Sequence, residues 1–146
     1  MSVLITDQER ALYQWQRDVT GFGDLGQEQL KAASVLVSRC GGVGGALAHA
    51  LAAAGVGRLF LAHAGNLRPE DLNRQLLMTH ARIGQSRAHQ AAYRLRRFNP
   101  FVQVIPIPQN ATAANVDKLA KYADVVACCA PRFAERLALK IGRAHV

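Results

Sequence analysis

The most constraining feature of this chain is a short apolar run that passes through a glycine-rich turn into an alanine-rich segment. Residues 34–38 read Ser-Val-Leu-Val-Ser, four glycines fall within residues 41–45, and residues 46–54 end at Gly55. This order predicts a strand, a tight turn and a helix, because glycine removes the Cβ obstruction. The first N–H groups of such a helix can bind a phosphate. We expect close packing on a sheet through four small residues, Ala46, Ala48, Ala50 and Ala52.

The remainder of the sequence alternates short apolar runs with amphipathic segments. Further strands are expected at residues 58–63, 102–107 and 124–129. Helices are expected at residues 7–18, 25–33, 86–98, 110–122 and 132–140. A polar loop precedes the helix expected at residues 86–98. The inward-facing positions of that helix are Ala88, Ala91, Ala92 and Leu95. Because strands and helices alternate, we predict an α/β fold with a doubly wound, mostly parallel sheet.

Composition places the chain among single-domain globular proteins. Its 146 residues, half of them hydrophobic, are enough to form one buried core. The net charge of +8 favours an anionic partner, but the arginines are scattered and no aromatic residues lie between them. We therefore expect a small anionic ligand and no nucleic acid.

The sequence gives no indication of a membrane span or a secretory signal. Its apolar runs are too short for a span, and the first ten residues lack the apolar core of a signal peptide. Three cysteines, two of them adjacent at Cys128 and Cys129, form neither a disulfide framework nor a CxxC pair. We expect both adjacent cysteines to end a buried strand as core residues. A cytoplasmic protein without a membrane partner is predicted.

Several short motifs follow one another in a specific order. After the glycine turn come Asn-Arg-Gln at 73–75, Ile-Gly-Gln at 83–85, Phe-Asn-Pro at 98–100 and Asp-Val-Val at 124–126. Together they resemble the ThiF/MoeB/HesA adenylyltransferases, which are relatives of ubiquitin-activating enzymes, over roughly residues 12–140. The resemblance implies a Rossmann-like, ThiF-type nucleotide-binding fold, incomplete here at its C-terminal side.

The resemblance also implies an activity and its partners. In such proteins a carboxylate, usually that of a ubiquitin-like or sulfur-carrier protein, attacks the α-phosphate of ATP and forms an acyl-adenylate. It further implies a homodimer in which the N-terminal helix of one subunit reaches the site of the other. Leu12, Trp15 and Val19 give that helix an apolar side, and Trp15 stands where the family has an arginine. An interface held by apolar burial is expected.

Site residues are assigned by position in the family motifs. The cofactor-binding set is Gly41, Gly42, Gly44, His63, Asp71, Asn73 and Arg74. Arg74 and Arg87 form the catalytic set: Arg74 would stabilise the triphosphate, and Arg87 stands in place of the family's lysine. Asp71 and Glu70 are the only acids close enough in sequence to replace lost family carboxylates.

Other positions depart from the family pattern, and most of these departures remove a carboxylate. Arg39 replaces the first glycine of the turn, His63 the ribose-binding aspartate, Gly65 a second acid, and Pro131 the aspartate that helps to hold magnesium. Magnesium prefers carboxylate oxygens, so its ligands are largely missing and no metal-binding residue is assigned. A zinc site could only lie beyond residue 140. For His63 we favour a hydrogen bond to the backbone over a ligand role.

The sequence is also compatible with two other functions. A non-catalytic ThiF-type subunit could keep the fold for dimerisation and recognition after losing its metal and ribose ligands. A dinucleotide-dependent oxidoreductase would need a GxGxxG turn and an acid at the ribose position, and His63 stands there instead. A catalytic cysteine or CxxC pairs further along the gene would support the adenylyltransferase.

We divide the chain into three parts. Residues 1–32 form an N-terminal helical segment, residues 33–140 a partial nucleotide-binding domain, and residues 141–146 a short tail. The tail back-translates to a string that resembles a widely used sequencing adapter. We therefore expect a fragment whose reading frame enters adapter sequence after about Lys140, and we expect this fragment alone to be inactive.

Overall fold

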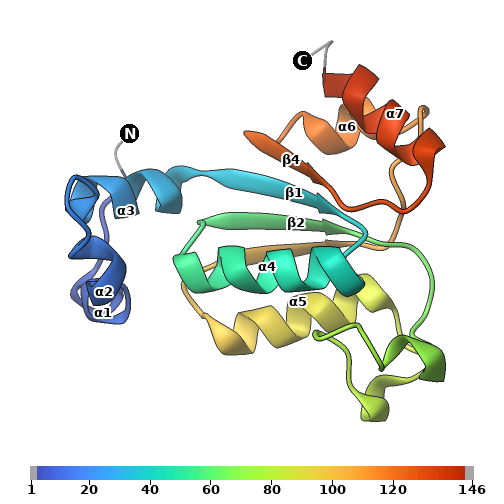
Figure 1. Cartoon of the computed structure of the whole chain (residues 1–146), viewed down its shortest axis with the longest axis horizontal. Helices are drawn as coiled ribbons and strands as arrows, with labels where there is room; N and C mark the ends of the chain where they lie inside the picture. The colour runs from blue at the N-terminus through green and yellow to red at the C-terminus, as the bar shows by residue number, and fades with distance from the viewer. Residues whose placement is uncertain (1–2, 144–146) are drawn as a thin grey trace.

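Four parallel strands form one sheet in the order β3-β2-β1-β4. The computed structural model describes residues 3–143, with side chains described through residue 140. The strands are β1 (Ser34–Ser38), β2 (Arg58–Ala62), β3 (Gln103–Ile107) and β4 (Val125–Cys128). The chain builds outward from β1 through β2 to β3 and then returns to the other side of β1 (Figure 1). This topology confirms the predicted doubly wound α/β fold.

Helices cover both faces of the sheet. On one face, α4 (Gly42–Ala54) packs on β1 and β2, and α5 (Arg87–Phe98) packs on β2 and β3 (Figure 1). On the other face lie α6 (Val116–Ala120) and α7 (Phe133–Arg143), which contact each other. Because side chains alternate along a strand, Val35 and Val37 join the first core and Leu36 joins the second.

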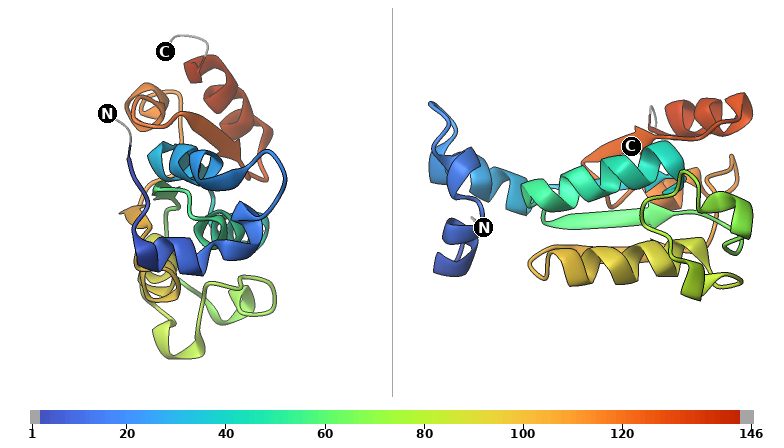
Figure 2. Two further views of the ribbon diagram at one scale, coloured as in Figure 1. Left: turned by 90° about the vertical axis from the view of Figure 1, so that its left-hand side faces the viewer. Right: turned by 60° about the horizontal axis from the view of Figure 1, so that its bottom comes forward.

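Three N-terminal helices lie beside the end of the sheet where the strands begin (Figures 1 and 2). They are α1 (Asp7–Leu12), α2 (Gln14–Arg17) and α3 (Gly23–Ala32). The single helix predicted over residues 7–18 was wrong, because the chain turns at Tyr13. That side chain is buried, and its hydroxyl accepts a hydrogen bond from Asn99 Nδ2 at 2.7 Å. Burying the Tyr13 ring determines the course of the chain more strongly than helix continuity does.

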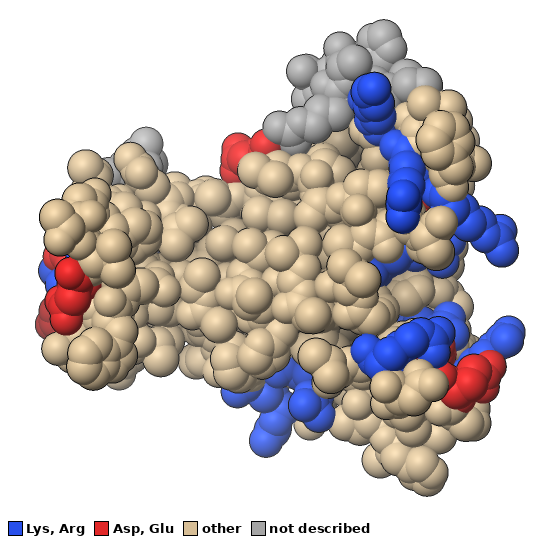
Figure 3. Space-filling view, in the orientation of Figure 1, with Lys and Arg blue, Asp and Glu red and all other residues tan. Residues whose placement is uncertain are grey.

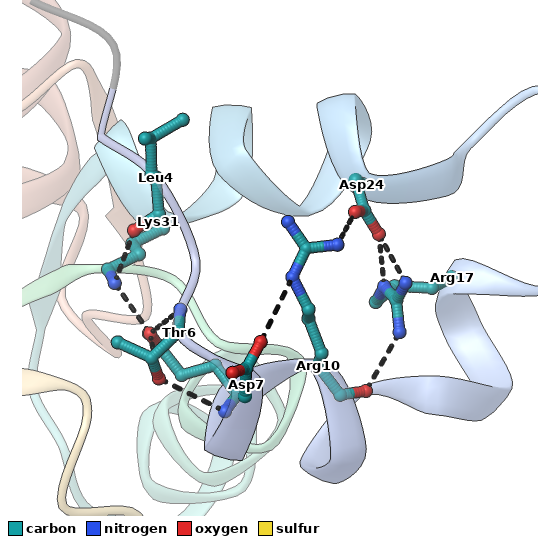
Figure 4. Close-up of polar contacts among 8 residues, drawn as sticks. Leu4, Thr6, Asp7, Arg10, Arg17, Asp24 and Lys31 are labelled. Carbon is teal, nitrogen blue, oxygen red and sulfur yellow. Dashed lines mark hydrogen bonds and ion pairs between the residues drawn. The ribbon is translucent and has the colours of Figure 1, made fainter.

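Ion pairs tie the N-terminal helices together. The Asp24 carboxylate on α3 binds the guanidinium groups of Arg10 and Arg17, and Lys31 Nζ lies 2.6 Å from the carboxylate of Glu9 (Figure 4). Thr6 and Glu9 form the expected capping box at the start of α1.

Helix α4 begins inside the glycine turn and ends at Gly55, which adopts the left-handed conformation with φ +83°. Its buried residues are Gly44, Gly45, Ala48 and Ala52. The prediction that Ala46 and Ala50 also pack on the sheet was wrong, since both are exposed. Positions two residues apart lie on opposite sides of a helix, whereas positions four apart share a side.

Two predictions in the C-terminal half also need correction. The helix expected over residues 110–122 is reduced to α6, because the Asn115 side chain accepts the Thr112 N–H and so holds a turn. Cys128 is exposed, since β4 is an edge strand and not a buried one. The predicted helix over residues 86–98 is confirmed as α5, with a Ser86 N-cap.

Within the described residues, no helix is long and apolar enough to cross a membrane. Helix α7 continues to Arg143, and residues 144–146 of the predicted tail lie outside the described part. The proposed division into three parts stays a prediction.

Candidate functional site

The turn between β1 and α4 is tight and depends on small residues. Arg39 has φ +63°, the left-handed region that a side chain usually avoids, and it stands at the position predicted to hold a glycine in related proteins. A Cβ on Gly44 would lie 2.3 Å from the Arg39 carbonyl oxygen, so glycine is required there. No side chain caps α4, which leaves the N–H groups of its first turn available to a ligand.

A cavity of about 440 Å³ opens in front of this turn. It lies at the carboxyl end of the sheet, between the parallel strands β1 and β4, where the order of the strands reverses, a usual place for ligands in such folds. Its lining comprises Arg39, Gly41, Gly42, Val43, His63, Asp71, Arg74, Gln75, Arg87, Cys129 and Pro131. Lys and Arg side chains gather on this side of the molecule (Figure 3).

A buried ion pair joins the loop after β2 to the start of α5. Arg87 donates from Nε and Nη2 to Asp71 Oδ2, at 3.0 and 2.6 Å. The same oxygen accepts the Arg68 N–H, and Oδ1 accepts Gln75 Nε2 at 2.7 Å. Burial alone raises the pKa of Asp71, but the hydrogen bonds from Arg68 and Arg87 and the charges of Arg87 and Arg74 outweigh it and lower the pKa below its usual value. Asp71 is therefore ionised and fully engaged.

A second ion pair links the glycine turn to α7. Arg39 Nε donates to Glu135 Oε2 at 2.8 Å, and the Glu135 side chain is buried. Glu135 Oε1 has no hydrogen-bond partner in the described part of the chain. Glu135 was not predicted as a site residue, because nothing in its local sequence relates it to a turn that lies 96 residues earlier.

His63 lies at the end of β2 and is buried, with 7% of its surface exposed. Its backbone N–H donates to the Ile107 carbonyl, while its ring Nδ1 lies 3.8 Å from Cys40 Sγ. Burial, followed by the positive charges of Arg87 and Arg39, lowers the pKa of His63 to about 4. The ring is therefore neutral at pH 7. The backbone hydrogen bond of His63 is made by its N–H, whereas the ring lies beside the Cys40 thiol.

Most of the predicted site residues converge on the cavity. Gly41, Gly42, His63, Asp71, Arg74 and Arg87 line it. Gly44 is buried in the turn but is not part of the lining, and Asn73 is exposed and also absent from the lining. Arg74 is half-exposed and donates to the Glu70 carbonyl and to Asn73 Oδ1, so Asn73 positions the arginine. Gln75, a buried amide of the same motif, was not singled out in advance.

Comparison with known proteins shows which family the chain belongs to. The sequence model of the ThiF family matches residues 13–141, which is most of the chain. The chain belongs to the ThiF family.

Relatives of this ThiF-family chain include the vegetative HesA protein of Trichormus variabilis, 46% identical over 134 residues, which cover 92% of this chain and 51% of that protein. The molybdopterin-synthase adenylyltransferase of Escherichia coli is 35% identical over 94% of this chain and 55% of its own length. The structure of E. coli TcdA, a tRNA N6-threonylcarbamoyladenosine dehydratase, in complex with AMP superposes with a TM-score of 0.90 at 25% identity, covering 99% of this chain and 58% of that one. The chain spans about half the length of these relatives.

A magnesium ion does not fit the side chains that line the cavity of this chain. Both oxygens of Asp71 are taken by protein hydrogen-bond donors, and Glu135 is tied to Arg39 outside the lining. No group of three or more His, Cys, Asp or Glu side chains within the described residues could hold a metal ion. Magnesium on a nucleotide takes one or two protein carboxylates besides phosphate and water oxygens, and the one carboxylate in this lining already accepts hydrogen bonds on both oxygens.

Proposed function

We propose that this chain binds an adenine nucleotide at the glycine turn, as part of a protein that activates a carboxylate as an acyl-adenylate. One observation carries the proposal: Arg74, Arg87 and the uncapped start of α4 meet at a single cavity. An AMP complex of the structural relative TcdA, and the name of the molybdopterin-synthase adenylyltransferase, support an adenine nucleotide.

The two arginines have different roles in this proposal. Arg74 is half-exposed, so its guanidinium can turn toward a phosphate and stabilise the charge that grows on it during adenylyl transfer. Arg87 is held in place by Asp71 and lines the same cavity, where its orientation is fixed. The carboxylate of a ubiquitin-like or sulfur-carrier protein would attack the α-phosphorus, and pyrophosphate would leave. A homodimer and a cytoplasmic location belong to the same proposal.

A second candidate is a non-catalytic ThiF-type subunit that binds nucleotide or partner without transferring an adenylyl group. The observation that favours it is the state of Asp71, whose oxygens are all engaged. Pyrophosphate exchange separates the two candidates. Exchange of labelled pyrophosphate into ATP in the presence of a carrier protein supports the enzyme, and nucleotide binding without exchange supports the subunit.

The nucleotide site is tested by replacing Arg74 with alanine. We expect Arg74→Ala to weaken ATP binding by about 1.5–3 kcal/mol, the usual contribution of a hydrogen bond to a charged group. Titration calorimetry measures the change. Arg58→Ala is the matched control, since Arg58 is an exposed arginine at the far end of β2. Equal ATP affinity in the Arg74→Ala variant and the parent would show that the site lies elsewhere.

A further inference from the structure

The cavity combines three arginines with carboxylates that are already paired. Arg39, Arg74 and Arg87 all line it, whereas Asp71 is the only acidic residue in the lining. Four donors surround the Asp71 oxygens within hydrogen-bond distance. Three guanidinium charges against the one carboxylate charge of the lining leave a net positive charge to meet a ligand.

Arg39 is the residue whose presence most needs an explanation. It holds a left-handed backbone conformation, which costs a residue with a side chain about 1–2 kcal/mol. Its Nε binds Glu135, but its two Nη nitrogens make no hydrogen bond within the described residues. One edge of the guanidinium is thus fixed, and the remaining donors are available at the cavity. The two Nη groups of a guanidinium form a fork of N–H donors that matches two phosphate oxygens.

We propose that this cavity binds the phosphates of a nucleotide without a divalent metal, and that Arg39, Arg74 and Arg87 supply the neutralising charge. The inference rests on the proposed nucleotide site and deepens it. A nucleotide without magnesium carries more negative charge than its magnesium complex and exposes more phosphate oxygens. Arginines attract and hydrogen-bond such a ligand more strongly, and their charge does not depend on pH in the ordinary range.

The inference is tested by titrating the 146-residue chain with ATP in two buffers of equal ionic strength, one with EDTA and one with excess magnesium. We expect ATP to bind in EDTA, and to bind several-fold more tightly there than in magnesium. Binding that requires magnesium, or that is tighter with it, overturns the inference and leaves the nucleotide site intact. An absence of binding in both buffers overturns the nucleotide site as well.

Two substitutions test the role of Arg39. Arg39→Gln should weaken ATP binding in EDTA about ten-fold or more, through loss of a charge-assisted contact. Glu135→Gln should have the opposite effect and strengthen ATP binding, because Arg39 is then no longer neutralised. Arg58→Gln is the matched control and should leave the affinity unchanged.

Thermal unfolding of each variant without ligand shows whether the chain still folds. Should Arg39→Gln unfold because Glu135 is left buried without a partner, the double variant Arg39→Gln, Glu135→Gln removes both charges together. That variant should also bind ATP at least ten-fold more weakly than the Glu135→Gln variant. Equal affinities of the two for ATP in EDTA would exclude a role for Arg39.

Discussion

His63 shows how strongly this site shapes the chemistry of one side chain. The ring is buried at the end of β2, beside Cys40 Sγ, and the charges of Arg87 and Arg39 act on it. A neutral imidazole next to two arginines can accept or donate a hydrogen bond without adding repulsion. Burial raises the pKa of the Cys40 thiol to about 12, so this thiol is protonated at neutral pH.

The low pKa of His63 makes the stability of the fold depend on pH. The pKa is about 4 in the folded chain and 6.5 for an ordinary histidine, so between these values the unfolded state binds the proton first. The stabilisation from a neutral His63 is complete above pH 6.5 and is lost as the pH falls toward 4. The loss is on the order of 3 kcal/mol.

Thermal unfolding from pH 4 to pH 7 measures this effect. We expect a shallower fall in Tm toward low pH for His63→Gln than for the parent chain. The control is His80→Gln, because His80 is exposed and should leave the slope unchanged. Parallel curves for His63→Gln and the parent would show that His63 does not carry the dependence.

At the scale of elements, the unit from β1 through the turn to α4 positions the whole cavity. Gly44 and Gly45 lie at the start of α4 and are buried against the turn. Cys129, which follows β4, lies 3.1 Å from the position that a Cβ of Gly44 would occupy. The turn is therefore closed on two sides by atoms with little freedom to move.

We expect Gly44→Ala to destabilise the fold by about 1–3 kcal/mol, because the new methyl group would meet the Arg39 carbonyl oxygen at 2.3 Å. Gly42→Ala is the matched control in the same helix, since its Cβ would meet nothing closer than 3.8 Å. Alanine also favours a helix over glycine, so the control should be neutral or slightly stabilising. Urea unfolding gives both values, and equal stabilities would contradict the tight turn.

At the scale of the whole molecule, the N-terminal helices leave an apolar surface exposed. Trp15 is 87% exposed, and Leu12 and Val19 are more than half exposed. Helices α1 and α2 lie beside the end of the sheet where the strands begin (Figure 1), whereas the cavity lies where β1 and β2 end. An exposed tryptophan of this size can bury about 150–250 Å² in an interface.

We expect the protein to dimerise through this surface, and Trp15→Ala to weaken the dimer without unfolding the chain. Sedimentation at several concentrations measures the association. Phe133→Ala is the control, because Phe133 is also an aromatic residue, 76% exposed, but lies on α7. A monomeric parent, or a dimer that depends on Phe133 and not on Trp15, would exclude this interface.

The alternation of strands and helices along the sequence predicted the parallel topology. Local sequence determined the strands, the glycine turn and the helix ends at Ser86 and Gly55. These features depend on backbone sterics and on the period of apolar residues, which act over a few positions. The same patterns, with the family resemblance, selected six residues that line the cavity.

Only the tertiary structure decided which charges meet. Glu135 reaches Arg39 across 96 residues, and Arg87 reaches Asp71 across 16. The tertiary structure also decided that α1 ends before Tyr13, where burial of the tyrosine ring outweighs helix propensity. Such outcomes depend on the energy of pairing and burying groups that come from different elements, and no short stretch of sequence contains that information.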